Sequence, residues 1–530
     1  MTDATRNLLE QHFDTAFAAP DGVARLRELI LTLAMQGKLV AQNPNDPPAS
    51  ELLKEIEVDK KRQVKAGKIK KPKSLPAIDQ SDAAYVLPQS WAWTRVGTIG
   101  NIFNGNSINA REKETKYAGA NGLPYIATKD VGYGLDALDY KNGIYIPESE
   151  EKFKIAHQGA VLICAEDGSA GKKCGITEQD ICFGNKLFAN EIFGGIPSKF
   201  ILYLYLSPVF RESFNAAMTG IIGGVSIAKF LELPVPLPPL DEQHRIVARI
   251  DQLMARCDAL EKLRKEREEK RLAVHAAAIK QLLDAPEGSA WDFIEQHFGA
   301  LYTVKENVAE LRKAILQLAV MGRLVPQNPK DGETRTVTME ELVGRKNLKN
   351  GLSLSPVDRP SDFVCLPLSA MKGSTIDCSI GKPIEIAADR AEPYLIKPRD
   401  IFIIRGNGNK DRVGIAGMAR MCPPNVLFPD LFIRVTLPPN KIDGDYFLIA
   451  WNSPVNREVL EGLAATTSGI WKVNQGHISE CEIRLPPLAE QKRIVAKVGE
   501  LTALCDTLDQ QIDAATGKQT ELLNAVMAQV

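Results

Sequence analysis

Pro238-Pro239-Leu240-Asp241-Glu242-Gln243-His244-Arg245-Ile246-Val247-Ala248-Arg249 occurs a second time in this chain, as Pro486-Pro487-Leu488-Ala489-Glu490-Gln491-Lys492-Arg493-Ile494-Val495-Ala496-Lys497. Each copy predicts the start of a helix, because prolines fit just before a first turn and acidic residues there meet the positive end of the helix dipole. The two copies lie 248 positions apart (486 minus 238) in a chain of 530 residues. The chain therefore contains an internal repeat.

Apolar residues follow each helix start at alternating steps of three and four, the spacing of a coiled-coil seam. The seam residues are Ile246, Ile250, Leu253, Cys257 and Leu260 in the first copy, and Ile494, Val498, Leu501, Cys505, Leu508 and Ile512 in the second. The two equivalent cysteines predict small apolar packing in preference to a metal site or a disulfide. Arg264, Arg267 and Arg271 interrupt the first seam, either as a solvated face or as a surface for DNA or a partner.

A second repeat links residues 26–40 (LRELILTLAMQGKLV) to residues 311–325 (LRKAILQLAVMGRLV), 285 positions further on. Glu10-Gln11-His12-Phe13 matches Glu295-Gln296-His297-Phe298 in the same register, and its histidine predicts a packing role. Each arm predicts an amphipathic helix that ends at a glycine, Gly37 or Gly322, in a left-handed cap. The second half is shorter by 37 residues (285 minus 248). Each half therefore consists of an arm, a variable middle and a long helix.

Charge and cysteine content limit the classes of function. The net charge is -1, so any contact with nucleic acid must come from local clusters. The one dense basic run, residues 59–73, predicts either a solvated linker or a mobile arm on nucleic-acid phosphates. Nine cysteines without a CxxC pair indicate a reducing compartment, predicted to be the cytoplasm. We find neither a secretory signal nor an apolar run of about 18 residues, which predicts that the chain is neither secreted nor membrane-spanning.

The middles, residues 85–237 and 355–485, are rich in short apolar and β-branched runs separated by Gly, Asn and Pro. This pattern predicts compact, strand-rich α/β domains. Each middle also contains one helix candidate near its end, at residues 199–217 and 445–464. The two middles share little residue by residue, although their flanks match well. The repeated arms and long helices thus flank two middles of different sequence.

Neither middle contains a recognisable active site. We find no Gly-x-x-x-x-Gly-Lys-Ser/Thr loop, no HExxH or zinc-finger spacing, no Gly-x-Ser-x-Gly elbow and no amino-methyltransferase signature. We therefore predict no catalytic residue and no metal ligand. The middles do contain polar side chains on glycine-flanked loops, and Arg, Lys, Asn and Gln are the types that pair with base edges and phosphates.

The predicted DNA-binding residues of the first middle are Asn104, Asn106, Asn109, Arg111, Lys129, Lys172 and Lys173. Those of the second are Arg405, Asn407, Asn409, Lys410, Arg412, Lys472, Asn474 and Gln475. The alternative for any single residue is an ordinary surface turn.

These features bring a family resemblance that covers nearly the whole chain. The chain resembles the DNA-specificity subunit of type I restriction-modification systems, through the twin Pro-Pro-Leu-x-Glu-Gln-x-Arg-Ile-Val-Ala helix starts and the stretch Leu87-Pro88-Gln89-Ser90-Trp91-Ala92-Trp93-Thr94-Arg95-Val96-Gly97. The doubled arms are similar to those of one subgroup. The second middle departs from the pattern, because its expected start, Leu366-Pro367-Leu368-Ser369-Ala370, lacks the tryptophans.

The resemblance implies an α/β protein with two globular, strand-rich target-recognition domains. Two long helices would separate them as an antiparallel coiled coil, and the repeated arms would complete a pseudo-two-fold internal repeat. The expected segments are an arm and basic linker (1–84), a first recognition domain (85–237), a first long helix (238–284), a second arm and linker (285–354), a second recognition domain (355–485) and a second long helix (486–530).

The resemblance further implies a chain without catalysis of its own, in which each domain reads one half of a split, asymmetric double-stranded DNA target. The helices and arms would bind two methyltransferase subunits, and restriction or translocase subunits would join them. No cofactor would bind this chain directly, with S-adenosylmethionine, and ATP with Mg, held by the partners. Two alternatives stand beside this reading: a complete enzyme in one chain, and a coiled-coil scaffold without sequence-specific DNA contact.

Overall fold

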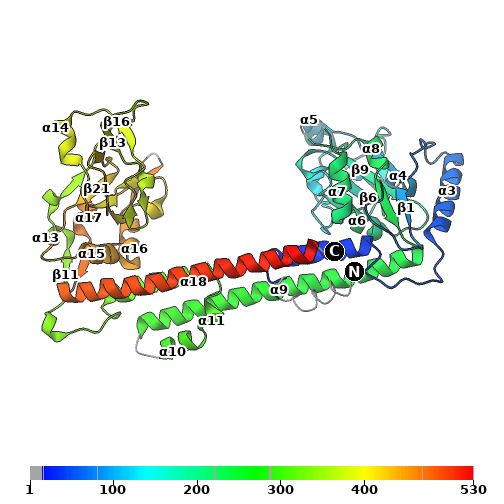
Figure 1. Cartoon of the computed structure of the whole chain (residues 1–530). Helices are drawn as coiled ribbons and strands as arrows, with labels where there is room; N and C mark the ends of the chain where they lie inside the picture. Colours follow the sequence, from blue (N-terminus) through cyan, green and yellow to red (C-terminus); the bar gives the residue numbers. More distant parts are fainter. Residues whose placement is uncertain are drawn as a thin grey trace. The chain divides into compact units, whose positions relative to one another are not determined.

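The computed structural model describes residues 15, 17–79, 82–219, 223–285, 289–467 and 469–528. The chain forms two compact units, Met1–Lys265 with Thr516–Val530, and Glu266–Ala515. Each unit combines one strand-rich domain with parts of both long helices (Figure 1). The predicted match at Glu10-Gln11-His12-Phe13 lies outside the described residues, so only its second copy can be placed.

Among the described residues, the domain of the first unit contains two four-stranded sheets, and three helices pack on one of them. One sheet has the order β2-β9-β6-β7 (Gly100–Asn104, Leu187–Ile192, Val161–Cys164, Cys174–Ile176) and the other β4-β3-β8-β5 (Tyr145–Ile146, Leu123–Ile126, Ile181–Phe183, Ile155–Ala156). Helices α6 (Ser198–Leu206), α7 (Pro208–Ala217) and α8 (Ile227–Leu231) pack on the first sheet (Figure 1). Because side chains alternate along a strand, Val161 and Ile163 face the helices while Leu162 and Cys164 face the second sheet.

The domain of the second unit repeats this plan. Its larger sheet has the order β12-β21-β17-β19-β15-β14 (Leu348–Asn350, Phe432–Val435, Ile401–Ile404, Ala416–Met418, Thr375–Ile376, Met371–Lys372), and its smaller sheet β16-β13-β20 (Lys382–Ile384, Phe363–Cys365, Val426–Leu427). Ile401 and Ile403 face the helices, while Phe402 and Ile404 face the other way. Two middles with little sequence in common therefore share the order of four strands in the larger sheet, β2-β9-β6-β7 and β12-β21-β17-β19, and one alternation of burial.

A two-strand ribbon closes each domain next to its long helix. In the first unit β1 (Ala92–Arg95) pairs antiparallel with β10 (Pro234–Leu237), and in the second β11 (Arg335–Thr338) pairs with β24 (Glu482–Leu485). The strand β11 precedes the expected domain start at residue 355. The segment 345–349, expected to be a linker, supplies part of β12 and so belongs to the sheet. We therefore propose that the second domain begins at Arg335.

Each predicted helix near a domain's end is in fact two helices. The first splits into α6 and α7, and the second into α15 (Gly444–Trp451) and α16 (Pro454–Leu463). A Ser-Pro pair stands at both breaks, where Ser207 and Ser453 are the residues before the proline that opens α7 or α16. Proline at the first helical position cannot donate to the preceding turn, so one helix ends and another begins there. A short helix follows in each domain: α8 in the first and α17 (Gln475–Glu480) in the second.

The long helices are α9 (Leu240–Asp284) and α18 (Leu488–Ala528), and the arms are α2 (Gly22–Met35) and α12 (Lys305–Met321). Both arms end as predicted, with Gly37 and Gly322 in the left-handed region. In the second unit, one hydrophobic core joins α12, the first half of α18 and the last turns of α9. In the first unit, α2 packs on the start of α9 and also contacts Leu523 and Val526 of α18. The two long helices thus share one core in the second unit, and in the first unit the arm α2 contacts both of them.

Two further features differ from the expected ones. The basic run begins inside helix α3 (Ala49–Lys65), so its first residues are helical and not a linker. Cys378 and Cys422 form a disulfide, whereas the scattered cysteines predict a reducing compartment. Among the described residues, no helix combines the length and the apolar character that crossing a membrane requires. Short additional helices complete the chain, namely α4 (Val96–Ile99), α5 (Ala110–Glu112), α10 (Ser289–Gln296), α11 (Phe298–Leu301), α13 (Met339–Leu342) and α14 (Ala388–Ala391).

Candidate nucleic-acid interface

Each arm is held to its long helix by the same ion pairs at repeat-equivalent positions. Arg27 bonds Asp258 (2.6 Å) and Glu261 (2.8 Å) on α9. Its equivalent 285 positions on, Arg312, bonds Asp506 (2.7 Å) and Asp509 (2.9 Å), which are equivalent to those acids at an offset of 248. The repeat found in the sequence is therefore a repeat of side-chain contacts.

Arg245 and Arg493 make a second equivalent contact, this time at the start of each long helix. Arg245 bonds Asp46 (2.6 Å), and Arg493 bonds Asp331 (2.7 Å). Both arginines reach back to the turn that follows the arm, so each domain and each arm are tied to one helix start. The segment after each arm therefore makes the same contact with a long helix in both units.

The Glu-Gln pair in the repeated helix start is buried in both copies. Gln243 donates to Pro238 O (2.9 Å), and Gln491 donates to Pro486 O (2.7 Å). The Glu242 carboxylate accepts from Trp91 Nε1 (2.9 Å) and from Gln42. Burial raises the pKa of Glu242, and these two hydrogen bonds oppose the increase. The motif therefore organises the interior of the helix start and carries no exposed chemistry.

In the second domain, the structure joins the two loops that the sequence had selected. A three-stranded sheet of order β18-β23-β22 (Gly406–Asn407, Ile470–Lys472, Ala465–Thr467) pairs one loop with the other. Val473 N donates to Arg405 O (2.9 Å), which fixes the register. The predicted residues 405–412 and 472–475 consequently lie on one continuous surface.

Several predicted residues of this surface have structural partners. Asn409 caps the turn at Asp411 N (3.0 Å) and Asn474 caps α17 at His477 N (2.9 Å). Gln475 donates to Leu348 O (3.1 Å), and Arg412 donates to Met371 O (2.8 Å). Asn407 accepts from Asn409 N (2.9 Å). These side chains shape the loops, and each retains donors or acceptors for a ligand.

The cations are less engaged. Lys472 is exposed, and the described residues offer its ammonium no hydrogen-bond or ion-pair partner. Lys410 lies over the Trp471 ring with its Nζ 4.9 Å from the ring centre. Arg405 makes one long hydrogen bond, from Nη1 to Asp430 O (3.5 Å). A patch of positive charge beside an aromatic ring suits a polyanion with stacked bases.

The first domain builds the corresponding surface from different residues. Val225 N donates to Ala165 O (2.9 Å), in the place of the bond between Val473 and Arg405. Lys173 donates to Thr128 O (3.1 Å) and lies over the Tyr133 ring, while Lys172 donates to Gly168 O (3.1 Å). The loops around residues 128–130 and 167–173 are thereby brought together. Exposed Lys129 lies in the first of these loops.

The remaining predicted residues of the first domain form a neighbouring loop. Asn104 and Asn106 both hold Lys154, whose Nζ donates to Asn104 Oδ1 (2.9 Å) and whose N donates to Asn106 Oδ1 (2.9 Å). Asn109 caps α5 at Glu112 N (2.8 Å). Arg111, one position into α5, is exposed. Three asparagines thus shape the loop, whereas Arg111 projects a charge from it.

Sequence reasoning missed Lys154 at this surface. It lies outside every glycine-flanked loop, and only the fold brings it to Asn104. Lys186, which is not among the predicted residues, pairs with Asp167 (2.5 Å) and so has a partner already. No local signal in the sequence distinguishes these two lysines from other surface lysines.

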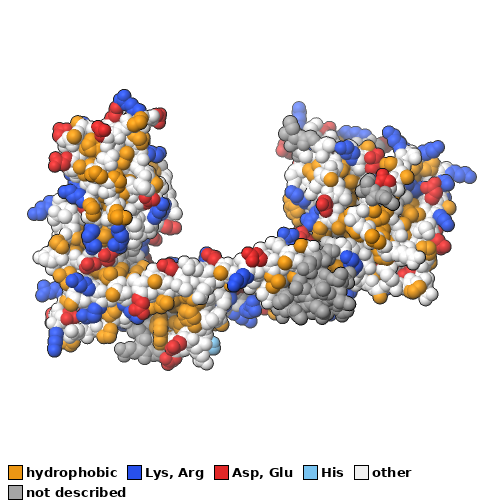
Figure 2. All heavy atoms as spheres, viewed as in Figure 1, with side chains coloured by type: hydrophobic (Ala, Val, Ile, Leu, Met, Phe, Trp, Pro, Cys, Tyr) orange, Lys and Arg blue, Asp and Glu red, His pale blue; other side chains and the backbone are white. Residues whose placement is uncertain are grey.

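The seam residues are buried within their own units. Ile246 and Ile250 are fully buried in the first core with Leu253 and Leu260 at its edge, and Ile494 and Val498 are buried in the second with Leu501, Leu508 and Ile512 packed against it. A cavity of about 440 Å³ opens beside this second seam, between α10, α11, α12 and α18. Figure 2 shows hydrophobic side chains exposed over this part of the unit.

The mid-seam arginines are also engaged. Arg264 donates to Phe17 O, and Arg271 contacts Thr303 Oγ1 and Glu268. Burial lowers the pKa of Arg271. Arg267 is exposed. In the part of the chain that the structure describes, no three His, Cys, Asp or Glu side chains are grouped to hold a metal ion.

Comparison with known proteins places this architecture. Residues 88–269 match the family described as "Type I restriction modification DNA specificity domain". The EcoEI specificity subunit of Escherichia coli is 28% identical over 95% of this chain and 93% of its own length. The EcoAI specificity subunit of Escherichia coli is 37% identical over 58% of this chain and 53% of its own length. A chain from a solved structure on complex assembly and conformational transition of the type I R-M system covers 84% of this chain and 99% of its own, with a TM-score of 0.50 at 16% identity, and so shares the fold. The chain is thus similar to type I restriction enzyme specificity subunits over nearly its whole length, and residues 88–269 match their DNA specificity domain.

Proposed function

We propose that this chain is the DNA sequence-recognition subunit of a type I restriction-modification complex. The observation that carries the proposal is that the two domains have similar folds but different loops. Two domains that share the order of four sheet strands adjoin equivalent helix starts, yet they present different side chains at equivalent positions. Such a pair suits a target made of two unlike half-sites, because each domain would read its own half.

The proposed readers are the exposed or lightly engaged cations, supported by the asparagines that shape their loops. In the second domain these cations are Arg405, Lys410 and Lys472, and in the first Arg111, Lys129 and Lys172. Asn and Gln side chains that already make one hydrogen bond retain further donors for base edges. Lys173 and Arg412 would act mainly by holding neighbouring loops in place.

The seams, arms and long helices are the proposed docking surface for partner subunits. We propose two methyltransferase subunits, because the arm and helix contacts occur twice in equivalent form. Restriction or translocase subunits would complete the assembly. S-adenosylmethionine, and ATP with Mg, would be held by those partners, and this chain would contribute recognition without catalysis. The proposed site of action is the cytoplasm.

The scaffold alternative remains testable. It predicts that the chain assembles partners without changing where they act on DNA. The exposed or lightly engaged cations on two loop surfaces favour the recognition account instead, since a pure scaffold does not require differing loops on a repeated fold.

Genome-wide mapping of N6-methyladenine tests the proposal. Cells that carry this chain with its methyltransferase partner would be compared with cells that lack only this chain. We expect a split, asymmetric motif that disappears when the chain is absent. An unchanged methylation pattern, with a partner shown to be active, would contradict the proposal and favour the scaffold.

A further inference from the structure

The first half contains a lysine-rich segment without a counterpart in the second half. Between residues 60 and 78 the sequence has no Asp or Glu, and residues 65–75 read KAGKIKKPKSL. We call residues 65–75 the basic strap. Its lysines at 65, 68, 70, 71 and 73 are all exposed, and the described residues provide none of them with a hydrogen-bond or ion-pair partner. In the second half the chain passes from Asp331 to β11 within a few residues.

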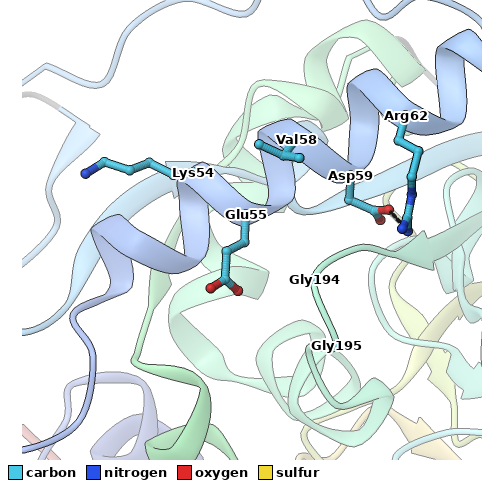
Figure 3. Close-up of a pocket in the computed structure, with 7 residues that line it drawn as sticks. All are labelled: Lys54, Glu55, Val58, Asp59, Arg62, Gly194 and Gly195. Carbon is cyan, nitrogen blue, oxygen red and sulfur yellow. Dashed lines mark hydrogen bonds and ion pairs between the residues drawn. The ribbon is translucent and has the colours of Figure 1, made fainter.

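The start of the strap is fixed to the domain by α3. Ile56 of α3 packs on the Gly194 turn, where an added Cβ would lie 2.6 Å from its side chain. Lys60 donates to Gly97 O (3.1 Å) and Thr98 O (3.2 Å) and lies over the Phe193 ring. Figure 3 shows α3 passing over the Gly194–Gly195 turn. The helix is therefore docked and cannot swing as a free arm.

The middle and the end of the strap are fixed as well. Ile69 packs against the hydrophobic core of the first unit, and Leu75 lies beside Gly97. Arg95, nearly buried, donates to Pro76 O (3.2 Å) and Ala77 O (2.8 Å) just beyond the strap. Apolar residues thus point inward along the segment while the lysines point outward. This alternation differs from that of a solvated linker, whose side chains have no preferred side.

The strap lies close to the proposed reading loops of its domain. Lys154, which holds Asn104 and Asn106, has a lowered pKa, mainly because of burial and further because of the nearby Lys70 charge. A phosphate group near Lys70 and Lys154 would offset the repulsion between their charges. Figure 2 shows Lys and Arg side chains on the edge of the domain where Figure 1 places α3.

We propose that the basic strap binds the phosphate backbone of double-stranded DNA beside the half-site that the first domain reads. The inference rests on the proposed function and adds a sequence-independent contact to it. Fixed lysines lose less conformational entropy on binding than lysines of a free linker, so their contact with phosphates is more favourable. Because the second half lacks a strap, affinity for the backbone would be unequal between the two half-sites.

The salt dependence of binding measures this contact. Each neutralised phosphate releases counterions and contributes about 0.9 to the slope of log affinity against log salt concentration. The complex of this chain with its methyltransferase partner would be titrated with a duplex that carries the mapped motif and with one that lacks it. Changing the strap lysines Lys65, Lys68, Lys70, Lys71 and Lys73 to Gln should lower the slope by about 3 to 4.5 on both duplexes.

A matched pair of variants controls for loss of charge. Lys70→Gln with Lys71→Gln should lower the slope by about 2, whereas Lys54→Gln with Lys61→Gln, on the outer face of α3, should leave it unchanged. The ratio of affinities for the two duplexes should stay the same in every variant, since phosphate contacts carry no sequence information. Thermal melting of each variant would verify that the domain is intact.

Three outcomes would overturn the inference or its basis. An unchanged slope in the five-lysine variant, with motif preference intact, would refute the strap alone. A wild-type complex that shows no preference for the motif would refute the proposed function. Loss of the methyltransferase partner from the variant, seen as a lower mass of the assembly, would show that the strap binds an acidic protein surface and not DNA.

Discussion

The two halves of this chain share the ion pairs at the starts of their long helices, and they differ in the loops of their domains. Arg245 with Asp46 and Arg493 with Asp331 are the same contact made twice, whereas Ala165 and Arg405 occupy one structural position with different chemistry. A buried contact tolerates few substitutions, because an unpaired buried group costs about 1–3 kcal/mol. The loops carry no such cost, which is why a repeated fold can present two different surfaces.

One function is even performed by different residues in the two halves. Tyr85 donates its hydroxyl to Met35 O (2.7 Å) at the end of the first arm. At the equivalent carbonyl, Val320 O, the donor is the Arg484 guanidinium (3.1 Å). The last carbonyls of a helix need donors whatever their source. Equivalence between the halves therefore lies in satisfied backbone groups as much as in matching residues.

The largest difference in stability is expected between two matching glutamines. Gln491 bonds Pro486 O, Lys441 O (3.1 Å) and Asp443 N (2.8 Å), whereas Gln243 bonds only Pro238 O. Gln491→Ala would remove the partner of one buried and two part-buried backbone groups and should lower the free energy of local opening by about 2 kcal/mol, against about 1 kcal/mol for Gln243→Ala. Hydrogen exchange of peptides at the two helix starts measures both. If both substitutions lower the free energy of local opening equally, the additional hydrogen bonds of Gln491 do not stabilise its helix start.

A smaller effect is expected from the position that holds His275 in one half and Leu523 in the other. His275 is buried beside Tyr302, and burial lowers its pKa although Glu310 acts in the opposite direction. As pH falls below about 6.5, the unfolded chain binds a proton before the folded chain does, so stability is lost toward acid. His275→Leu should reduce the loss of melting temperature between pH 7.5 and 5.5 by about 1–3 °C.

The exposed His297 supplies the control for that change. His297→Leu removes a histidine that stacks on Phe293 at the surface of the same unit. Its melting temperature should follow that of the wild type across the same pH range. If the two variants respond alike, the pH dependence does not come from burial of His275.

Much of the frame could be predicted from the sequence. The offsets of 248 and 285 identified equivalent residues that the structure shows in equivalent contacts, such as Arg27 and Arg312. Apolar runs with turn signals predicted strand-rich domains, and Gly37 and Gly322 predicted the ends of the arms. Repeats and helix caps depend on residues close together in the sequence, so they can be recognised without the structure.

The rest depended on contacts between distant segments. Strand β11 was missed because it pairs with β24 across most of the domain, and no tryptophans mark it. The Ser-Pro pair at Ser207 is a local signal for the break between α6 and α7, although one continuous helix was predicted there. Helix α3 also had a signal, since Ala49, Leu52 and Ile56 recur at helical spacing. The partners of Asn104 and Gln475 had none, because only tertiary structure shows which asparagines and glutamines shape a loop.

The central claim is that each domain reads one half of a split target. Arg405→Ala with Lys472→Gly gives the second domain the residues that the first domain has at the equivalent positions, Ala165 and Gly224. N6-methyladenine mapping in cells with this variant and its partner is the most direct test. We predict that one half of the motif becomes relaxed or altered while the other half and the spacing stay the same. A change in both halves, or an unchanged motif at full methylation, would contradict the account.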